Sequence, residues 1–277
     1  MIKIFMTVRN RLAITKKAIE ALERNSAIPH NLYIYDNCTN YRIREHFEFA
    51  YNLYKHKIVS KYVFNTDGST FNAFSKAVAC NEFGYDHQQD PKWKSYEFIT
   101  ILDNDIIVLP GWDQLVKNAW QDIHKYGLDS QIKIVGQLPG GIKCSNKSDK
   151  KFGGCEAKIG KLGGSGFWNI STNFFRDVGY LDLNRLVGYD KRHDSEYWNL
   201  LERVNKGKPY IIGLNSKLCI HCGKIAGSVC NQLSRNRGQK DKINKIKFEE
   251  AEDKIEKMSF DEFMKVIKGD KNLMNNW

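Results

Sequence analysis

The sequence lacks the features of a membrane-spanning or secreted protein. No stretch approaches twenty uninterrupted apolar residues, the length that a transmembrane helix needs. The opening residues, MIKIFMTVRNRL, contain no apolar segment followed by a small-residue cleavage site, so we expect no signal peptide. No internal repeat is visible either. We therefore expect a soluble, cytoplasmic protein, located in the host cytoplasm if a virus encodes it.

A disulfide framework is also missing. The seven cysteines are an odd number and are scattered along the chain, so we expect free thiols. Cys219 and Cys222 form a CxxC pair, which together with Cys144 and Cys155 could make a four-sulfur zinc site. The wider spacing of the second pair makes this structural zinc the weaker alternative.

Acidic residues are in the minority. The chain has 43 Lys and Arg against 32 Asp and Glu, a net charge of +11. Such an excess suits an anionic partner, whether a nucleotide, a nucleic acid or an acidic membrane surface. The alternative is a Lys-rich composition with no functional meaning. With 277 residues and 42% hydrophobic content, the chain can bury the core of one large α/β domain or of two small ones.

The first forty residues predict a parallel sheet. Residues 2–8 are typical of a buried strand, a helical pattern of apolar residues follows, and residues 32–35 form a second strand candidate. This strand–helix–strand order is typical of a βαβ unit. Ligands of such sheets bind beyond the carboxyl ends of the strands, where Asp36 is placed.

The stretch 96–110, YEFITILDNDIIVLP, is the centre of the interpretation. Two apolar runs rich in β-branched residues flank Asp103 and Asp105. If the strand continued straight, both carboxylates would share a face and repel each other unless a cation lay between them. A hard divalent ion suits such oxygen ligands. The alternative is an acidic turn between two short strands.

Further elements follow in order. We expect helices over 41–57, after Gly68 and after Pro110, and strands at 61–64, 132–138 and 210–214. Residues 139–166, rich in Gly and Lys, predict a mobile loop or a binding flap. Asp190 to Glu196 should open a helix that ends near Gly207. Residues 259–262 fit a capping box in a helical tail.

The order of these signals resembles the GT-A glycosyltransferases, particularly family two. The segments that carry the resemblance are 7–10, 36–37, 65–72, 103–105, 163–182, 194–196 and 221–223, so that it covers residues 2–223. It implies an α/β, Rossmann-like fold with a mixed, mostly parallel central sheet flanked by helices. Residues 1–223 would form the glycosyltransferase domain, with a nucleotide-sugar half (1–110) and an acceptor half (111–223), and 224–277 a basic helical C-terminal extension.

The resemblance also implies roles for individual residues. The nucleotide-sugar, usually a UDP-sugar, would be bound by Thr7, Arg9, Asn10, Asp36, Asn65, Gly68, Asp103 and Asn104. Asp103, Asp105 and His221 would hold Mn²⁺ or Mg²⁺. The acceptor segment would comprise Gly164, Ser165, Gly166, Phe167 and Trp168. Asp194 would be the general base, with Glu196 and Asp190 as alternatives.

The implied function is metal-dependent transfer of a hexosyl or pentosyl group to an acceptor hydroxyl with inversion of configuration. The acceptor would be a cell-envelope or lipid-linked glycan or, given the charge, a hydroxymethylated nucleic acid such as phage DNA. Two other functions stay open: a GT-A-like nucleotidyltransferase, and a nucleic-acid-binding protein without catalysis. The first usually has a Gly-rich loop after the first strand, and Val8–Arg9–Asn10 lacks the glycines.

Overall fold

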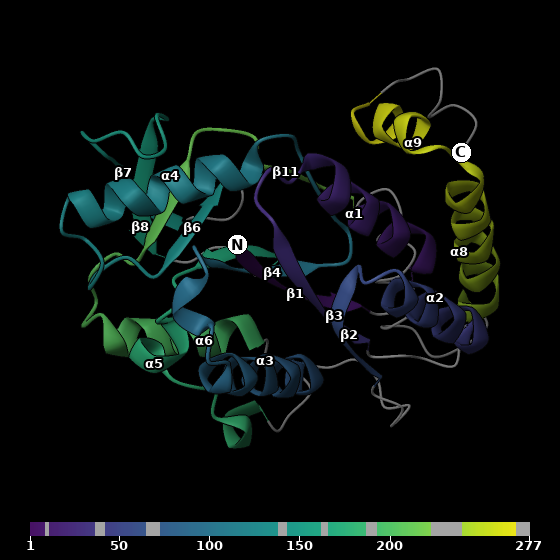
Figure 1. The fold of residues 1–277 in the computed structure, drawn as a ribbon, viewed down its shortest axis with the longest axis horizontal. Coiled ribbons are helices and arrows are strands. Elements are labelled where there is room, and N and C mark those ends of the chain that lie inside the picture. Colours follow the sequence, from purple (N-terminus) through teal and green to yellow (C-terminus); the bar gives the residue numbers. More distant parts are fainter. Residues whose placement is uncertain are drawn as a thin grey trace.

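The chain folds around one large mixed β-sheet. The computed structural model describes residues 1–8, 11–36, 42–64, 73–137, 143–161, 166–186, 193–222 and 240–269. In these residues, nine strands lie in the order β3-β2-β1-β4-β9-β6-β10-β8-β7, and β11 and β5 pair in a second, two-stranded sheet. Helices cover both faces of the large sheet (Figure 1). The predicted mixed, mostly parallel sheet flanked by helices is confirmed.

Four parallel strands build the first half. In chain order the elements are β1 (Ile2–Val8), α1 (Leu12–Asn25), β2 (His30–Asp36), α2 (Ile43–Lys55), β3 (Val59–Phe64), α3 (Ala73–Gln89), the 3₁₀ turn Trp93–Ser95 and β4 (Ile99–Asp103). All seven residues of β1 are buried, because β2 and β4 flank this strand and helices cover its faces. The register pairs Val8 with Asp36 and Thr7 with Asp103, so the carboxyl ends of β1, β2 and β4 lie level.

The second half adds antiparallel strands. Its elements are β5 (Ile106–Val108), α4 (Trp112–Lys125), β6 (Ile134–Gln137), β7 (Lys143–Lys147), β8 (Ala157–Lys161), β9 (Phe167–Ile170), α5 (Phe174–Val178), the 3₁₀ turn Leu183–Leu186, α6 (His193–Val204), β10 (Ile211–Leu214) and β11 (Cys219–His221). Strand β9 runs antiparallel between β4 and β6, and β11 pairs antiparallel with β5.

The expectation of a loop or flap over 139–166 is wrong for much of that segment. Strands β7 and β8 form an antiparallel hairpin, and β8 pairs with β10 at the edge of the large sheet. The polar composition misled the prediction because β8, the strand next to the edge, buries no large apolar side chain. Ala157 and Gly160 are the buried positions of β8.

The described part of the C-terminal extension, residues 240–269, is helical, as predicted. Helix α8 (Lys240–Lys257) lies beside α1 and α2, and α9 (Phe260–Ile267) follows it (Figure 1). The capping box at the start of α9 is confirmed, because the Ser259 hydroxyl accepts the Glu262 N–H and the Glu262 carboxylate accepts the Ser259 N–H. Phe260, Phe263 and Met264 bury the inner face of α9 in the main core.

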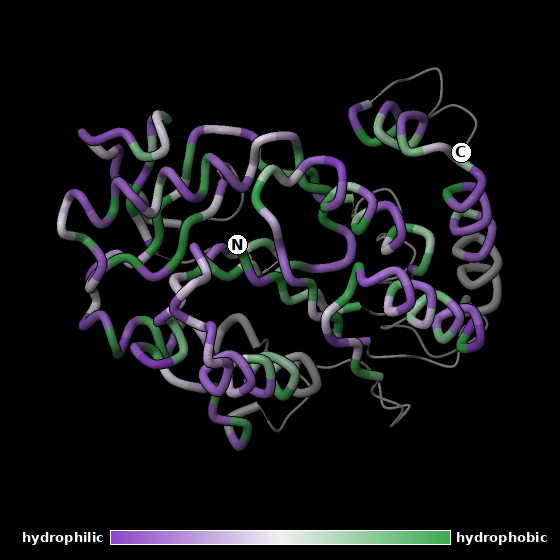
Figure 2. The backbone as a smooth tube through the Cα atoms, viewed as in Figure 1, coloured by the Kyte–Doolittle hydropathy of each residue, from purple (hydrophilic) through white to green (hydrophobic). Residues whose placement is uncertain are grey.

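Two apolar clusters, one on each side of the sheet, stabilise the fold. The larger one joins the inner faces of α1, α4 and α9 to the sheet, and the smaller one lies under α3, α5 and α6. The central strands are hydrophobic over much of their length, whereas the helices alternate between hydrophobic and hydrophilic residues (Figure 2). Among the described residues, no helix is both long enough and apolar enough to cross a membrane.

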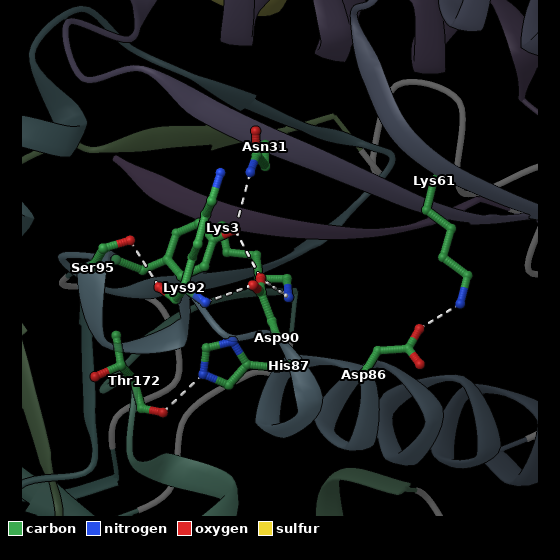
Figure 3. A network of polar contacts seen from close by, with 10 residues as sticks. Lys3, Asn31, Lys61, Asp86, His87, Asp90, Lys92, Ser95 and Thr172 are labelled. Carbon is green, nitrogen blue, oxygen red and sulfur yellow. Dashed lines mark hydrogen bonds and ion pairs between the residues drawn. The ribbon is translucent and has the colours of Figure 1, made fainter.

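A polar network closes the amino end of the sheet, opposite the level carboxyl ends. Lys3, 1% exposed, reaches Asp90 at 3.3 Å, and Asp90 also accepts hydrogen bonds from the Tyr96 hydroxyl and the Lys92 N–H (Figure 3). Burial lowers the pKa of Lys3 although Asp90 opposes this effect. The buried ammonium group therefore depends on this one carboxylate, and the network is structural.

Candidate active site

The polar side chains of the carboxyl edge come from three neighbouring strands. Strand β2 ends at Asp36 and β4 ends at Asp103, and Thr7 is the last residue but one of β1. Thr7 is 5% exposed and its hydroxyl donates to Asp103 Oδ1 at 2.9 Å. This contact follows from the register, which pairs the two residues directly. The orientation of the Asp103 carboxylate is therefore fixed from the adjacent strand.

Gly166 lies against the same carboxylate. Its carbonyl accepts the Asp103 N–H at 2.9 Å, and a Cβ at this glycine would lie 3.3 Å from Asp103 Oδ2. The absence of a side chain thus leaves the second oxygen of Asp103 accessible. Of the three described residues of the predicted acceptor segment, 166–168, Gly166 is the one that lies at the site.

Asp105 is in a turn rather than in a continuous strand. Strand β4 ends at Asp103 and β5 begins at Ile106, so the two carboxylates are not placed by strand alternation as expected. Asp105 is 6% exposed, and its Oδ2 contacts the Arg11 guanidinium and the His221 Nε2, the latter at 3.3 Å. The β5–β11 pairing brings His221 here, and the Cys222 N–H donates to the Asp105 carbonyl at 2.8 Å.

The charges of this cluster support one another. Burial would raise the pKa of Asp105, but the hydrogen bond from His221 and the charge of Arg11 outweigh it, so that the pKa lies below its ordinary value. The same hydrogen bond raises the pKa of His221, and the negative charges of Asp105 and Asp103 raise it further. Burial opposes this rise. Asp105 is thus held ionised in a buried position.

The donor set fits a divalent cation. Asp105 is ionised and buried, and its Oδ2 contacts the Arg11 guanidinium and the His221 imidazole. Carboxylate oxygens and an imidazole nitrogen are ligands that Mn²⁺ accepts, whereas Mg²⁺ prefers oxygen alone. Among the residues that the structure describes, no three His, Cys, Asp or Glu side chains are gathered as a metal group. The structure nevertheless brings Asp105 and His221 into contact, and Asp103 lies close enough for its charge to affect His221.

Asp36 is completely buried at the end of β2. Its Oδ2 lies 2.8 Å from His46 Nδ1 on α2 and accepts the Tyr62 hydroxyl of β3 at 2.7 Å. Its Oδ1 has no hydrogen-bond partner within the described parts of the chain. The rings of Phe47 and Phe64 lie 4.2 Å apart, and Phe64 also contacts Tyr62. Since Phe64 pairs with Asp36 in the sheet, a carboxylate oxygen without a partner lies next to aromatic surface.

Three other predicted residues have packing roles in the structure. The Asn104 side chain, expected to contact the nucleotide, donates to Thr15 Oγ1 at 2.9 Å and so holds α1. Phe167 and Trp168, expected at the acceptor, instead have their rings in the core, against Trp112 and Tyr197. Both are in β9, whose four residues are all buried because the strand lies between β4 and β6.

The remaining predicted residues lie outside what the structure describes. These are Arg9, Asn10, Asn65, Gly68, Gly164, Ser165 and Asp190, together with the side chains of Asp194 and Glu196. The backbone places Asp194 and Glu196 in the first turns of α6. Of the four zinc candidates, Cys155, Cys219 and Cys222 are free thiols and the Cys144 side chain is not described.

Sequence reasoning missed three residues of the site. Arg11 is separated from Asp105 by 94 positions, and nothing in the sequence distinguishes it from the other basic residues, of which the chain has 43 with Arg11 included. His46 and Tyr62 contact Asp36 from two different elements. A single His in a helix that also has exposed aromatic residues does not indicate a contact with a carboxylate at the end of a strand.

No model of a known protein family matches the chain, and no curated protein matches it. Several solved structures are similar to this chain. S. aureus TarS is similar at 10% identity over 88% of this chain and 41% of that one, with a TM-score of 0.43. A mannosyltransferase from Pyrobaculum calidifontis, in complex with GDP-Man and Mn²⁺, has 10% identity over 84% and 60%, with a TM-score of 0.49.

GalNAc-T7, in complex with UDP, GalNAc and Mn²⁺, has 13% identity over 79% of this chain and 44% of that one, with a TM-score of 0.50. This chain thus spans 41%, 60% and 44% of the lengths of these three proteins. At such identities the likeness concerns the fold. The chain has the GT-A fold that the sequence resemblance implied.

Proposed function

We propose that this protein is a glycosyltransferase that moves a sugar from a nucleotide-sugar, a UDP-sugar, to an acceptor hydroxyl. The observation that carries the proposal is the convergence of Asp103, Asp105 and His221 beside Asp36 at the carboxyl edge of a GT-A sheet. Ligands of parallel sheets bind at this edge. GalNAc-T7, which has a similar fold, was solved with UDP, GalNAc and Mn²⁺, and this supports the donor class.

Asp36 would recognise the base. A buried carboxylate oxygen without a partner is costly, and a base with a ring N–H, such as uracil, would satisfy it. His46 and Tyr62 hold the other oxygen, so Oδ1 is presented in a fixed direction. The ring N3–H of uracil lies on the pairing edge of the base, so this contact would recognise the base by that edge.

Asp105 and His221, with Asp103, would hold Mn²⁺ or Mg²⁺ at the diphosphate. When bound, the ion supplies Lewis-acid stabilisation of the charge that develops on the leaving diphosphate. Thr7 fixes the orientation of Asp103, and Arg11 places a positive charge at the same position. These residues bind and orient the donor.

Asp194 would be the general base. An acceptor hydroxyl must lose its proton as it attacks the anomeric carbon, and a carboxylate on the acceptor side can take it. The first turns of α6 carry Asp194 and Glu196, which come from the second half of the chain. Direct attack by the acceptor inverts the configuration of the anomeric carbon.

The acceptor is a hydroxyl compound, and the described part of the basic hairpin gives a nucleic acid little support. Lys147 pairs with Glu156, Lys161 pairs with Glu202, and Lys150 lies over the Tyr126 ring at 4.4 Å. Two lysines of this hairpin are therefore paired with neighbouring acids, and a third lies against an aromatic ring. A glycan or lipid-linked acceptor needs no such surface charge, and we propose this class.

Calorimetry with UDP and Mn²⁺ tests the proposal. Asp105→Asn keeps the shape of the side chain but removes its charge, so the Mn²⁺-dependent affinity for UDP should fall at least about tenfold, which is about 1.4 kcal/mol. Asp129→Asn, an exposed carboxylate that pairs with His124, is the matched control and should bind like the wild type. Equal affinity of the Asp105 variant and the wild type would contradict the assignment.

A further inference from the structure

Helices α1 and α2 begin without caps of their own. Arg11 and Arg42 occupy the two N-cap positions, with left-handed φ values of 65° and 52°, and neither side chain caps its helix. Ser, Thr, Asp and Asn are the residues that normally fill this position. The two helices follow β1 and β2 in the chain, and the carboxyl ends of these strands belong to the nucleotide edge of the sheet.

Helix α8 supplies the missing cap of α1. Glu252 is 0% exposed, and its Oε2 accepts the Ala13 N–H at 2.8 Å. Ala13 is the second residue of α1, so its N–H is one of the donors that an N-cap side chain would satisfy. A carboxylate also suits the positive end of the helix dipole. The cap therefore comes from a residue 239 positions further along the chain.

The next residue of α8 holds the start of α2. The Asp253 carboxylate pairs with the Arg42 guanidinium, which also contacts Glu45 in the first turn of α2 at 3.5 Å. Two consecutive residues of α8 thus fix the first turns of the two helices that follow β1 and β2. Figure 1 shows α8 beside both helices.

Stability alone does not account for Glu252. Burial raises its pKa to about 7, although the Ala13 N–H and the charges of Arg42 and Arg11 oppose the shift and Glu256 adds to it. Its second oxygen has no hydrogen-bond partner within the described residues. An acid in such a position costs stability when it ionises, which is the pattern of groups that serve a site rather than the core.

Arg11 connects this contact to the active site. Its backbone begins α1 under the Glu252 cap, and its guanidinium reaches Asp105. A shift of the first turn of α1 would therefore move the positive charge that balances Asp105.

We propose that α8 braces the nucleotide site, with Glu252 and Asp253 as positioning residues that hold the first turns of α1 and α2 in their binding geometry. The inference rests on the proposed function. Fixing these turns before the donor arrives lowers the entropy cost of binding. The C-terminal extension, which the resemblance left without a role, is thereby part of the donor site.

The test compares four variants of the full chain by UDP titration with Mn²⁺ at pH 8. Glu252→Ala and Asp253→Arg should each weaken UDP roughly fivefold or more, within the range of a lost cap. Glu252→Gln keeps an acceptor for the Ala13 N–H and should stay within about twofold of the wild type. Glu256→Ala is the matched control, because it removes an ion pair to Lys16 from the same helix without touching either helix start.

A charge swap supplies the second arm. Arg42→Asp combined with Asp253→Arg should recover most of the affinity that Asp253→Arg loses. Melting temperatures of all variants separate the brace from general destabilisation: a purely structural role would weaken UDP in proportion to the loss of melting temperature, in Glu256→Ala as well. Wild-type affinity in both Glu252→Ala and Asp253→Arg would overturn the brace. Absence of UDP binding in the wild type would instead overturn the proposed function.

Discussion

The buried carboxyl of Glu252 should make the free energy of unfolding fall as the pH rises. Its pKa is about 7 in the folded chain against 4.5 for the ordinary side chain. Between these two values the folded state binds more protons than the unfolded state, so stability falls as the pH rises through this window. The full difference of about 2.5 pKa units corresponds to about 3 kcal/mol, and about 2.5 kcal/mol of it is lost between pH 5 and 8.

Glu252→Gln removes this titration while keeping the shape of the side chain. Other groups titrate in the same range, so the informative quantity is the difference in unfolding free energy between the variant and the wild type. That difference should change by about 2.5 kcal/mol in favour of the variant from pH 5 to pH 8. Urea unfolding followed by circular dichroism at four pH values measures it.

The matched control is Glu250→Gln, an exposed position on the same helix. Its unfolding free energy should stay within about 0.5 kcal/mol of the wild type across the range, as for most surface substitutions. A Glu252→Gln curve that runs parallel to the wild type would refute the reasoning, since it would mean that the carboxyl keeps its ordinary pKa and is open to water.

Three further predictions concern other parts of the molecule. Asp194→Asn should lower the rate of sugar transfer by about two orders of magnitude or more with little change in donor affinity, and an inactive Glu196→Gln enzyme beside an active Asp194→Asn one would reassign the base. Gly166→Ala places a Cβ 3.3 Å from Asp103 Oδ2, so Mn²⁺–UDP affinity should fall several-fold at an unchanged melting temperature; an unchanged affinity would mean that Asp103 has room to move. Asp90→Ala leaves the buried Lys3 ammonium without its carboxylate partner and should lower the free energy of unfolding, measured in urea, by about 3 kcal/mol. Adding Lys3→Met in the same background should restore most of this loss.

The sequence was sufficient for the strand–helix order of residues 2–125 but not for the β7–β8 hairpin or for the local geometry around Asp105. The β-branched runs around Asp103 predicted β4 and β5 because such runs are typical of buried strands. They could not show that the chain turns between Asp103 and Asp105. The β7–β8 hairpin was missed because its strands carry few apolar residues at the edge of the sheet.

The candidate site was predicted in part for a related reason. Asp36, Asp103 and Asp105 end strands or follow them directly, so sequence and topology together place them. His221 was expected from the resemblance, and the β5–β11 pairing brings it to Asp105. Arg11 and Glu252 have partners 94 and 239 positions away, and neither local propensity nor periodicity contains information about contacts of that separation.

The long separation between Ala13 and Glu252 has a consequence for synthesis on the ribosome. The first helix leaves the exit tunnel early, but its cap is translated 239 residues later. At about 5–20 residues per second this delay is roughly 10–50 s. During this interval the nascent amino-terminal half has all its parallel strands but an incomplete start of α1. A chain that stops before α8 keeps this defect, and we expect it to bind the proposed donor more weakly than the full chain does.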